Sequence, residues 1–530
     1  MTDVAAQPAM LAIGMPGAAE ALTEEIAGSK AYQLWRMARL GLPVPPAFVL
    51  PTTLCEPVNR CEAWAEGALR QGLADGIARL EAATGRRFGG SRAPLLVSVR
   101  SGAARSMPGM LATVLDVGLN PQSVRGLIGL TGNPRLAWDC CRRFAQSYAE
   151  VVDGADPAPF EAALQRLIEE EGAEGEAELD SEALERLAQT YRDLADGLPD
   201  DPRDQLAAAA RAVYRSWDGA RAREYRRLNA IEGLAGTAVT VQAMVFGNAG
   251  GNSGAGVAFS RNPATGANAL YVEFVADGQG EDVVAGRRVP GGFERLEARQ
   301  PEVARRLAEG VRQLEREFRD VQDVEFTVEN GRLYFLQTRA AKRTPRAALR
   351  VLVDFVREGL IGETEALARA GGIDVERARI TRFASRLPEA ATALAASPGV
   401  ASGRAAFDSA AARAMAEAGD PVILVRHDTS TEDVAGFAVA DGILTAAGGR
   451  TAHAAVVARQ MGKPCLVGCR ALEIAPEGNR ATLAGRPVRA GDWVSIDGDA
   501  GTVMLGRLEI VSELPVDELA EIERWRRGVG

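Results

Sequence analysis

Histidine is the residue type that this chain uses least. His427 and His453 are the two histidines in 530 residues, and the six cysteines form no CxxC pair. A structural zinc site takes four cysteine or histidine ligands in a tight spacing, so this pattern argues against bound zinc. The cysteines are predicted to be reduced thiols of a cytoplasmic protein.

Long hydrophobic runs and an excess of basic charge are also absent. No segment approaches the roughly 18 to 20 apolar residues that cross a membrane, and the first residues lack the basic start and apolar stretch of a secretory signal. The net charge is −10, which argues against general binding to nucleic acid or to anionic membranes. The sequence therefore predicts a cytoplasmic protein with neither kind of partner.

The composition is that of a folded chain with more than one core. It is 47% hydrophobic and 25% charged, and 530 residues exceed what one core holds. The periodicity of apolar residues predicts a multidomain α/β and α+β protein. The expected parts are an alternating helix and strand segment at 1–120, a helical insertion at 121–235, a strand-rich α+β segment at 236–344, a helical connector at 345–395, a compact α/β unit at 396–510 and a charged helix at 511–530.

The stretch GGRTAHAAVVARQMGKPCLVG, residues 448 to 468, predicts a turn, then a helix, then a short strand. Thr451 fits an N-cap and Gly462 fits the C-terminal stop. His453 would then lie in the first turn, where unpaired backbone N–H groups and the helix dipole favour an anion. An imidazole there is suited to carry a phosphoryl group, although a capping or packing histidine gives the same pattern. His427, which precedes an expected N-cap at Thr429 or Ser430, is interpreted as structural.

Two features of the first 120 residues suit a nucleotide phosphate. Lys30 begins a helix after the residues AGS and is a point charge that can reach phosphate. Arg100 ends a β-rich run and is followed by a small-residue loop that includes Ser106 and Gly109. Such a loop can fold its amides over phosphates while the arginine offers a bidentate fork. An ordinary surface loop and a solvated lysine are the alternatives.

The segment DVEFTVENGRLYFLQTR predicts a hairpin that turns at Glu329, Asn330 and Gly331. Asp323 and Glu325 are two residues apart, so they leave the same face of one strand and repel unless a cation lies between them. Gln337 and Arg339 share a face of the partner strand. Oxygen ligands of this kind suit Mg²⁺. An exposed strand face with alternating charge is the other interpretation.

Together these segments resemble the pyruvate, phosphate dikinase family. The similar stretches, in that family's order, are AGSKAYQLWRMARLGLPVPPAF, LLVSVRSGAARSMPGM, TAVTVQAMVFGNAGGNSGAGVAFSRNPATG, GQGEDVVAG, DVEFTVENGRLYFLQTR and GGRTAHAAVVARQMGKPCLVG. The resemblance implies an ATP-grasp nucleotide-binding domain with a helical insertion, followed by a swivelling phosphohistidine α/β domain.

The resemblance also implies roles for particular residues, with ATP as substrate and Mg²⁺ as cofactor. His453 would be the phosphorylated nucleophile, and Thr451 matches a position that some members phosphorylate for regulation. Asp323, Glu325 and Gln337 would hold Mg²⁺ and polyphosphate. The ATP-binding residues would be Lys30, Arg100, Ser106, Met107, Gly109, Gln242, Met244, Val245, Glu281, Gln337 and Arg339.

One departure from the family is large. Members have a third, C-terminal barrel that binds pyruvate or phosphoenolpyruvate, and this sequence stops at about the point where that barrel would begin. We therefore expect the acceptor half of the reaction to lie on another chain. Smaller departures are Arg450 and Ala452, where the dikinases have Met and Ser.

Three functions are open at this point. The leading one is a dikinase-type phosphotransferase that moves the ATP β-phosphoryl group to His453, with phosphate or water taking the γ-phosphoryl group. The acceptor would be pyruvate or another hydroxyl or enol compound, bound directly or by a separate subunit, and a homo-oligomer is compatible with the sequence. The rival is a phosphocarrier or regulatory module that labels itself and passes phosphate to a protein. A catalytically inactive ATP-binding protein is the third, and the intact set of candidate residues argues against it.

Overall fold

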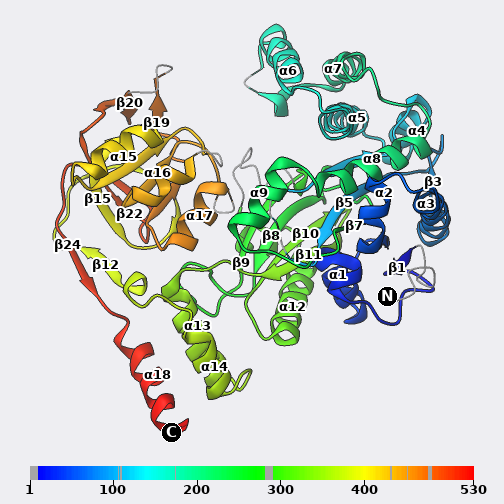
Figure 1. Cartoon of the computed structure of the whole chain (residues 1–530). Coiled ribbons are helices and arrows are strands. Elements are labelled where there is room, and N and C mark those ends of the chain that lie inside the picture. The colour runs from blue at the N-terminus through cyan, green and yellow to red at the C-terminus, as the bar shows by residue number, and fades with distance from the viewer. Residues whose placement is uncertain are drawn as a thin grey trace. The chain divides into compact units, whose positions relative to one another are not determined.

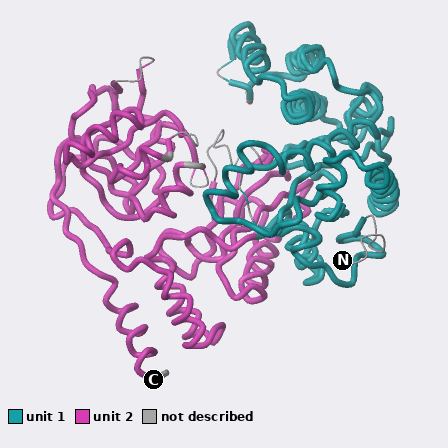
Figure 2. Tube along the Cα trace, viewed as in Figure 1, with its two compact units in different colours: residues 1–251, 334–338 teal, residues 252–333, 339–530 magenta. Residues whose placement is uncertain are grey.

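A computed structural model describes residues 10–105, 107, 110–173, 175–280, 291–429, 433–449, 452–475 and 480–529. The chain divides into two compact units (Figure 2): unit 1 is 1–251 with 334–338, and unit 2 is 252–333 with 339–530. Within the described residues, no helix is both long enough and apolar enough to pass through a membrane.

Unit 1 is built on a five-stranded antiparallel sheet (Figure 1). In spatial order its strands are β1(Leu11–Ile13), β2(Ala47–Leu50), β7(Thr237–Ala243), β5(Val97–Ala103) and β6(Thr113–Val117). Two further strands, β3(Arg87–Phe88) and β4(Pro94–Leu95), precede β5 in the chain and form a separate parallel pair. Valines 97, 99, 239 and 241 alternate along β5 and β7 and join the main hydrophobic core, as a half-buried strand requires.

The helices of unit 1 fall into those that pack on this sheet and those of the insertion. The first group is α1(Glu24–Arg39), η2(Thr52–Leu54), α3(Ala63–Thr84), α8(Pro202–Ser216) and also α5(Pro134–Tyr148), which contacts β6, whereas α2(Cys55–Asn59) packs on α3 and α8. The remaining helices are α4(Pro121–Thr131), η3(Ala149–Asp153), α6(Ala158–Glu171), η4(Glu176–Glu178), α7(Ser181–Leu194) and α9(Ala220–Leu228). Helices α5, α6 and α7 enclose a core of their own that includes Phe160, Leu184 and Tyr191.

A buried ion cluster ties this helical core together. Both carboxylate oxygens of Asp139 are paired, one with Arg142 at 2.7 Å and one with Arg143 at 3.0 Å. Both arginines also contact Glu176. Burial alone would raise the pKa of the Asp139 carboxyl, but the two arginines outweigh it and hold that pKa below its ordinary value.

Unit 2 begins with a second antiparallel sheet. Its spatial order is β11(Arg332–Ala340), β10(Gln322–Glu329), β8(Gly254–Phe259) and β9(Tyr271–Ala276), and residues 334–338 of β11 are counted with unit 1. The helices α11(Phe293–Arg299) and α12(Pro301–Phe318) accompany it. The predicted turn is confirmed, since Asn330 and Gly331 both have positive φ, 50° and 78°.

The later part of unit 2 holds a mixed eight-stranded sheet. In spatial order its strands are β13(Glu389–Thr392), β23(Thr502–Leu505), β22(Trp493–Asp497), β15(Val400–Ala406), β16(Val422–Arg426), β17(Gly442–Thr445), β18(Cys465–Val467) and β14(Leu394–Ser397). Strands β15 to β18 are parallel neighbours. The associated elements are α15(Ser409–Glu417), α16(Val434–Val439), α17(His453–Met461) and a three-stranded meander, β19(Leu472–Ile474), β20(Arg480–Leu483) and β21(Arg486–Arg489).

The segments that flank this sheet differ from the sequence expectation. The connector is helical only in α13(Pro345–Arg357), α14(Glu363–Ala370) and η5(Glu376–Ala378), whereas β12(Ile380–Phe383) and β13 lie inside the stretch predicted to be helical. The last segment begins with β24(Ile510–Glu513) before α18(Val516–Val529). Strands β12 and β24 pair with each other, and local periodicity gives no sign of a partner so distant in sequence.

The Asp139 cluster predicts a pH-dependent stability. Asp139→Asn leaves two buried arginines short of a charge partner and should lower the free energy of unfolding by about 3 kcal/mol at pH 7. Because the folded-state pKa is depressed, the wild-type advantage is complete above the unfolded pKa near 4 and is lost as pH falls through the folded value. Urea unfolding from pH 7 down to pH 3 measures the difference, and Asp196→Asn, an exposed change in the same insertion, is the control. A constant difference across that pH range would contradict the assignment.

Candidate active site

One face of the unit 1 sheet carries polar side chains. Arg100 of β5 pairs in register with Thr240 of β7, and Ser98 pairs with Gln242. Directly opposed residues leave the same face of a sheet, so these four side chains lie together, opposite the valine face. Ser98, Thr240 and Gln242 are buried. Arg100 therefore lies in the middle of β5, which runs on to Ala103, and not at the strand end that the sequence predicted.

Two buried atoms on this face are left for a ligand. The Thr240 hydroxyl and the Gln242 amide nitrogen have no hydrogen-bond partner among the described residues. Burying such groups unpaired is costly, so a donor and acceptor set of this kind is typical of a site that closes around a polar molecule. A nucleotide has the complementary chemistry.

Only one of the three predicted ATP-binding residues at 242–245 lies on a strand, Gln242 of β7. Strand β7 stops at Ala243, and Met244 and Val245 follow it as irregular chain. The Met244 N–H still donates to the Leu96 carbonyl at 2.9 Å, and its side chain packs against the main core.

Lys30 is positioned by a close approach between α1 and β5. Helix α1 is broken at Gly28, whose φ is 71° and ψ 157°, so Lys30 lies in the first turn of the helix that resumes there. A Cβ atom at Gly28 would lie 1.8 Å from the Gly102 carbonyl oxygen, and a Cβ atom at Gly102 would lie 3.7 Å from the Lys30 Cβ. Glycine is thus required for α1 to reach β5, and a helix start with a lysine in its first turn suits phosphate.

The small-residue loop is described only in part. Met107 is buried against Ala103 and Ala222, whereas Ser106 and Gly109 lie outside the described residues, as does Glu281. Arg100 Nη2 donates to Gln337 Oε1 at 3.2 Å, which joins β5 to the part of β11 that belongs to the same unit.

The predicted carboxylate pair lies on β10 in unit 2. Asp323 is opposite Phe259 of β8 and Glu325 is opposite Val257, which confirms that they share a face. Arg339 Nε donates to Asp323 Oδ2 at 2.8 Å, while the buried Oδ1 has no hydrogen-bond partner among the described residues. Burial raises the pKa of the Asp323 carboxyl above its ordinary value, and Arg339 opposes that rise.

These carboxylates fit Mg²⁺. Mg²⁺ is commonly held by one or two carboxylates together with substrate phosphates, and a buried carboxylate oxygen left open is a ligand of the right kind. No group of three or more His, Cys, Asp or Glu arranged for a metal occurs within the described parts of the chain, so a site completed by protein side chains of those types alone is not indicated.

Sequence reasoning missed Glu273 on β9. It is opposite Val257, the residue that also faces Glu325, so both glutamates leave the same face of the sheet. Glu273 is 2% exposed, the burial expected of a core residue and not of a surface acid. The sequence feature that could have identified Glu273 is a single charged residue inside the apolar run YVEFV. The feature that could have identified Thr240 and Gln242 is their alternation with valines along the strand.

His453 is the first residue of α17, in the phosphohistidine candidate stretch. Strands β16, β17 and β18 are parallel, and α17 follows β17, so its N-terminus is at the edge formed by their carboxyl ends, where open α/β sheets bind ligands. The expected helix, its stop at Gly462 and the strand after it are confirmed. The N-cap is Ala452 and not Thr451, and it makes no side-chain cap. Thr451 lies outside the described residues.

The other histidine lies on the neighbouring loop at the same edge. The His427 carbonyl accepts a hydrogen bond from the Ala447 N–H at 2.8 Å, so its main chain supports the loop that leads to α17. Ser430 lies outside the described residues, so the N-cap expected at Thr429 or Ser430 stays a prediction; the next described helix, α16, begins at Val434 after Asp433. His427 itself is exposed.

Two family profiles match the chain. The profile "Pyruvate phosphate dikinase, AMP/ATP-binding domain" matches residues 61–306 and 294–358, and "PEP-utilising enzyme, mobile domain" matches residues 418–501. The first contains Arg100, Gln242 and the β10 carboxylates, and the second contains His453.

Comparison with individual curated proteins gives the same family as the profiles. Pyruvate, phosphate dikinase of Clostridium symbiosum is 43% identical over 492 residues, which cover 91% of this chain and 56% of the relative. The enzyme of that name from Rhizobium meliloti is 42% identical over 94% of this chain and 58% of its own. The chloroplastic enzyme of Flaveria pringlei is 40% identical over 95% and 53%. The chain thus spans a little over half the length of these relatives.

The close contact between α1 and β5 predicts that glycine is required at position 28 and is not required at position 41. Gly28→Ala forces a Cβ atom into the Gly102 carbonyl and should cost about 3 kcal/mol or more, with loss of ATP binding. Gly41→Ala is the matched control, since Gly41 follows the same helix with φ 78° and has no atom within 4 Å of its Cβ position. It should cost only about 1 kcal/mol and leave ATP affinity unchanged. Thermal unfolding and ATP titration measure both, and equal losses in the two variants would refute the close-approach argument.

Proposed function

The chain belongs to the pyruvate, phosphate dikinase family, and from that membership we propose that it transfers the β-phosphoryl group of ATP to His453. The observation that carries the proposal is the polar sheet face around Arg100, with its unpartnered buried Thr240 hydroxyl and Gln242 amide. Such a face suits the fixed donors that phosphoryl transfer requires, because catalysis of this reaction is mostly positioning and charge neutralisation.

Each candidate residue has a role in the proposal. Lys30 and Arg100 bind ATP phosphates, Gln242 contributes to the nucleotide pocket, and Gln337 holds the Arg100 fork at 3.2 Å. Ser106, Met107, Gly109, Met244, Val245 and Glu281 complete the ATP site in the proposal, with Arg339 beside the β10 carboxylates. The nucleotide-binding part is proposed to comprise 1–120 and 236–344 with 121–235 inserted, and the mobile part 396–510.

The transfer balances as a double displacement. The neutral imidazole nitrogen of His453 forms a bond to the β-phosphorus, and the bond from that phosphorus to the AMP oxygen breaks. AMP leaves, and inorganic phosphate takes the γ-phosphoryl group to give pyrophosphate. The histidine keeps one phosphoryl group. The first turn of α17 offers backbone N–H groups and the positive end of the helix dipole to that group.

In the proposal, Asp323, Glu325 and Gln337 would hold Mg²⁺. When bound, this ion neutralises the charge that builds up on the transferred phosphates. Arg339 keeps one oxygen of Asp323 engaged and leaves the other for the ion.

The acceptor belongs to the second half of the reaction. We propose pyruvate or another hydroxyl or enol compound, bound directly or by a separate subunit. A cytoplasmic location is part of the same proposal, because all six cysteines are free thiols, although some relatives are chloroplastic.

The first test follows label from ATP into the protein. ATP labelled at the β- or γ-phosphate is mixed with the protein, Mg²⁺ and inorganic phosphate, and His453→Asn is the control. The proposal expects β-label in an acid-labile bond, release of AMP and pyrophosphate, and no label in the variant. Label from the γ position alone with release of ADP would replace the dikinase reaction by an ordinary kinase step. Transfer of the label to a protein and to no small compound would favour a phosphocarrier, and no label at all would end the catalytic proposal.

The proposed role of the β10 carboxylates predicts that a substitution at Asp323 slows labelling by weakening the binding of Mg²⁺. Asp323→Asn should lower the labelling rate by about 100-fold or more at ordinary Mg²⁺ concentration, because removing one ligand or donor in a charge-stabilised transfer costs about 3 kcal/mol. Excess Mg²⁺ should restore part of the rate. Asp320→Asn, a neighbouring residue paired with Arg343 at 2.7 Å, should label normally. Equal rates in the wild type and Asp323→Asn would remove Asp323 from the metal site.

A further inference from the structure

A two-stranded ribbon joins the mobile part to the rest of unit 2. Strand β12 leads into the eight-stranded sheet and β24 leads out of it, and the two are antiparallel with Ile380 opposite Glu513 and Phe383 opposite Ile510. Ala384 N–H adds one bond to the Glu509 carbonyl at 2.9 Å. The chain therefore enters and leaves the mobile part side by side (Figure 1).

This ribbon is too short to be stable by itself. It contains four residue pairs, and all four residues of β24 are exposed. An isolated two-stranded ribbon is at best marginally stable in water, since three strands or a packed face are needed for independent stability. The ribbon also contacts β15, where the Val400 N–H donates to Thr381 Oγ1 at 2.9 Å, and a second element supports its other end.

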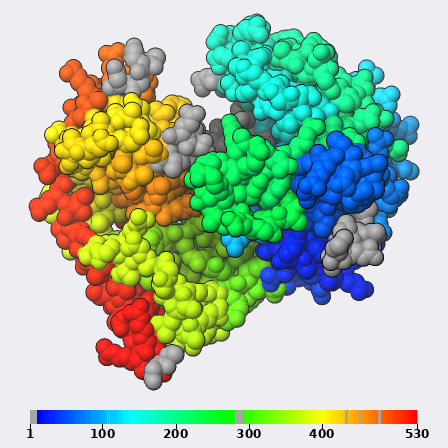
Figure 3. Space-filling model, in the orientation of Figure 1, coloured from blue at the N-terminus to red at the C-terminus, as the bar shows by residue number. Residues whose placement is uncertain are grey.

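The support lies at the end of β24, where α18 begins. Ile522 and Trp525 of α18 are buried in the same core as Leu352 and Phe355 of α13 and Ala366 of α14. Trp525 is 1% exposed. The space-filling view shows the red surface of α18 directly against the yellow-green surface of α13 and α14 (Figure 3).

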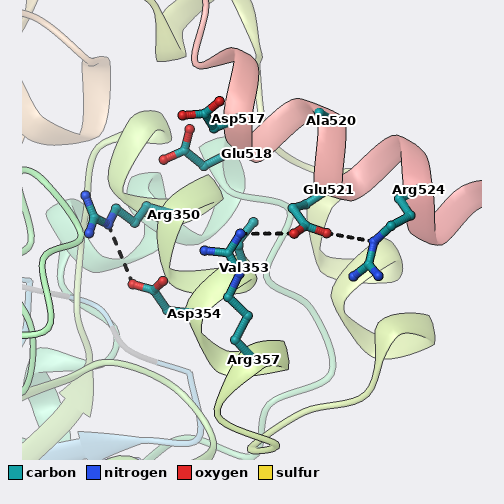
Figure 4. A pocket seen from close by; sticks show the side chains of 9 residues that line it. All are labelled: Arg350, Val353, Asp354, Arg357, Asp517, Glu518, Ala520, Glu521 and Arg524. Atoms are coloured by element: carbon teal, nitrogen blue, oxygen red, sulfur yellow. Dashed lines mark hydrogen bonds and ion pairs between the residues drawn. The ribbon is translucent and has the colours of Figure 1, made fainter.

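Ion pairs fix α18 on both helices. Glu521 accepts from Arg357 of α13 at 3.0 Å and from Arg524 at 2.8 Å (Figure 4). Arg524 also lies 4.0 Å from Glu363 of α14. A hollow of about 540 Å³ between α13 and α18 is lined by Arg350, Asp354 and Glu518, so the contact between these helices is not continuous.

The helices beneath α18 are themselves firmly held. Arg261, at the end of β8, is 1% exposed and pairs with Glu315 of α12 and with Glu358 just after α13. Its guanidinium also lies over the Phe355 ring at 4.6 Å. Helix α13 is thereby fixed to the sheet that carries Asp323 and Glu325. The flexible part of the connection must lie beyond α13 and α14.

We propose that α18 is a clasp that keeps the exit strand β24 paired with the entry strand β12. With α18 seated, the mobile part turns about a double-stranded tether whose two strands start from one fixed base. With α18 released, β24 loses its fixed base and its pairing with β12 weakens. The consequence for catalysis rests on the proposed function: a looser tether lowers the effective concentration of His453 at the ATP site.

The clasp is suited to be a separable element. A helix of 14 residues is marginal in water without tertiary contacts, so α18 exists because it is seated. The Trp525 indole N–H is buried with no hydrogen-bond partner among the described residues, which weakens the seat relative to a purely apolar ring.

Hydrogen exchange on the full chain tests the clasp without requiring activity. Trp525→Ala should speed amide exchange in α18 and in 380–383 and 510–513 by about tenfold or more, with α13 and the eight-stranded sheet unchanged. Trp525→Phe keeps an apolar ring and removes the unpaired N–H, so it should protect the ribbon as well as the wild type. Trp64→Ala removes a tryptophan that is 49% exposed and is the control.

A charge swap covers the case in which Trp525→Ala fails to fold. Arg357→Glu and Glu521→Arg should each loosen the ribbon, and the double variant should restore its protection, because the pair is remade with reversed sign. Rapid exchange in α18 with unchanged exchange in the ribbon would overturn the proposal, since β12 and β24 would then pair without the clasp.

Labelling of His453 separates this inference from the proposed function. If ATP labels His453 in the wild-type protein, the Trp525→Ala substitution should slow this labelling by about three- to tenfold, with the affinity for ATP unchanged. Unchanged labelling with a loosened ribbon would overturn the catalytic consequence. If the wild type takes no label, the proposed function fails, and hydrogen exchange still decides whether α18 is a clasp.

Discussion

Strand register is the constraint on which the candidate site depends. In both antiparallel sheets a side chain faces either an apolar core or the polar surface, and the period of two leaves no intermediate choice. Pairing of Arg100 with Thr240 gathers the polar face of unit 1, and pairing of Glu325 with Val257 aligns Glu325 with Glu273. A slip of one residue would turn these groups into the apolar cores and the valines onto the polar face, so the register that forms the cores also forms the site.

A histidine that carries a phosphoryl group imposes a second constraint, because it has to leave one site and reach another. Under the proposed function, this requirement divides the molecule into parts that are fixed and a part that moves. Arg261 and the core around Phe355 fix α13 to the sheet of the carboxylates, and the short β12–β24 ribbon connects this base to the eight-stranded sheet. A tether of two paired strands restricts the positions that the moving part can reach. This restriction requires that β24 stay paired with β12.

Sequence patterns predicted the features that depend on local spacing. The Asn330–Gly331 turn, the shared face of Asp323 and Glu325 and the helix that begins at His453 are examples. Features set by distant partners were missed. Residues 101–103 look like a loop because they are small, yet β7 extends the strand through them. The break at Gly28 depends on Gly102 of another element. Strand β12 exists because it pairs with β24, whose residues lie 127 to 133 positions later in the chain.

Under the proposed function, the absence of a side-chain cap at the start of α17 has a role. A serine, threonine or aspartate at the N-cap would accept hydrogen bonds from first-turn N–H groups and compete for them with any anion. Ala452 occupies that position and has no acceptor to offer, so the helix gives up stability at its start and leaves these donors to another partner. The neighbouring residue is His453. A phosphoryl group on that histidine brings the negative charge that the helix start lacks, and the phosphorylated form thereby gains the capping interaction that the sequence withholds from the free form.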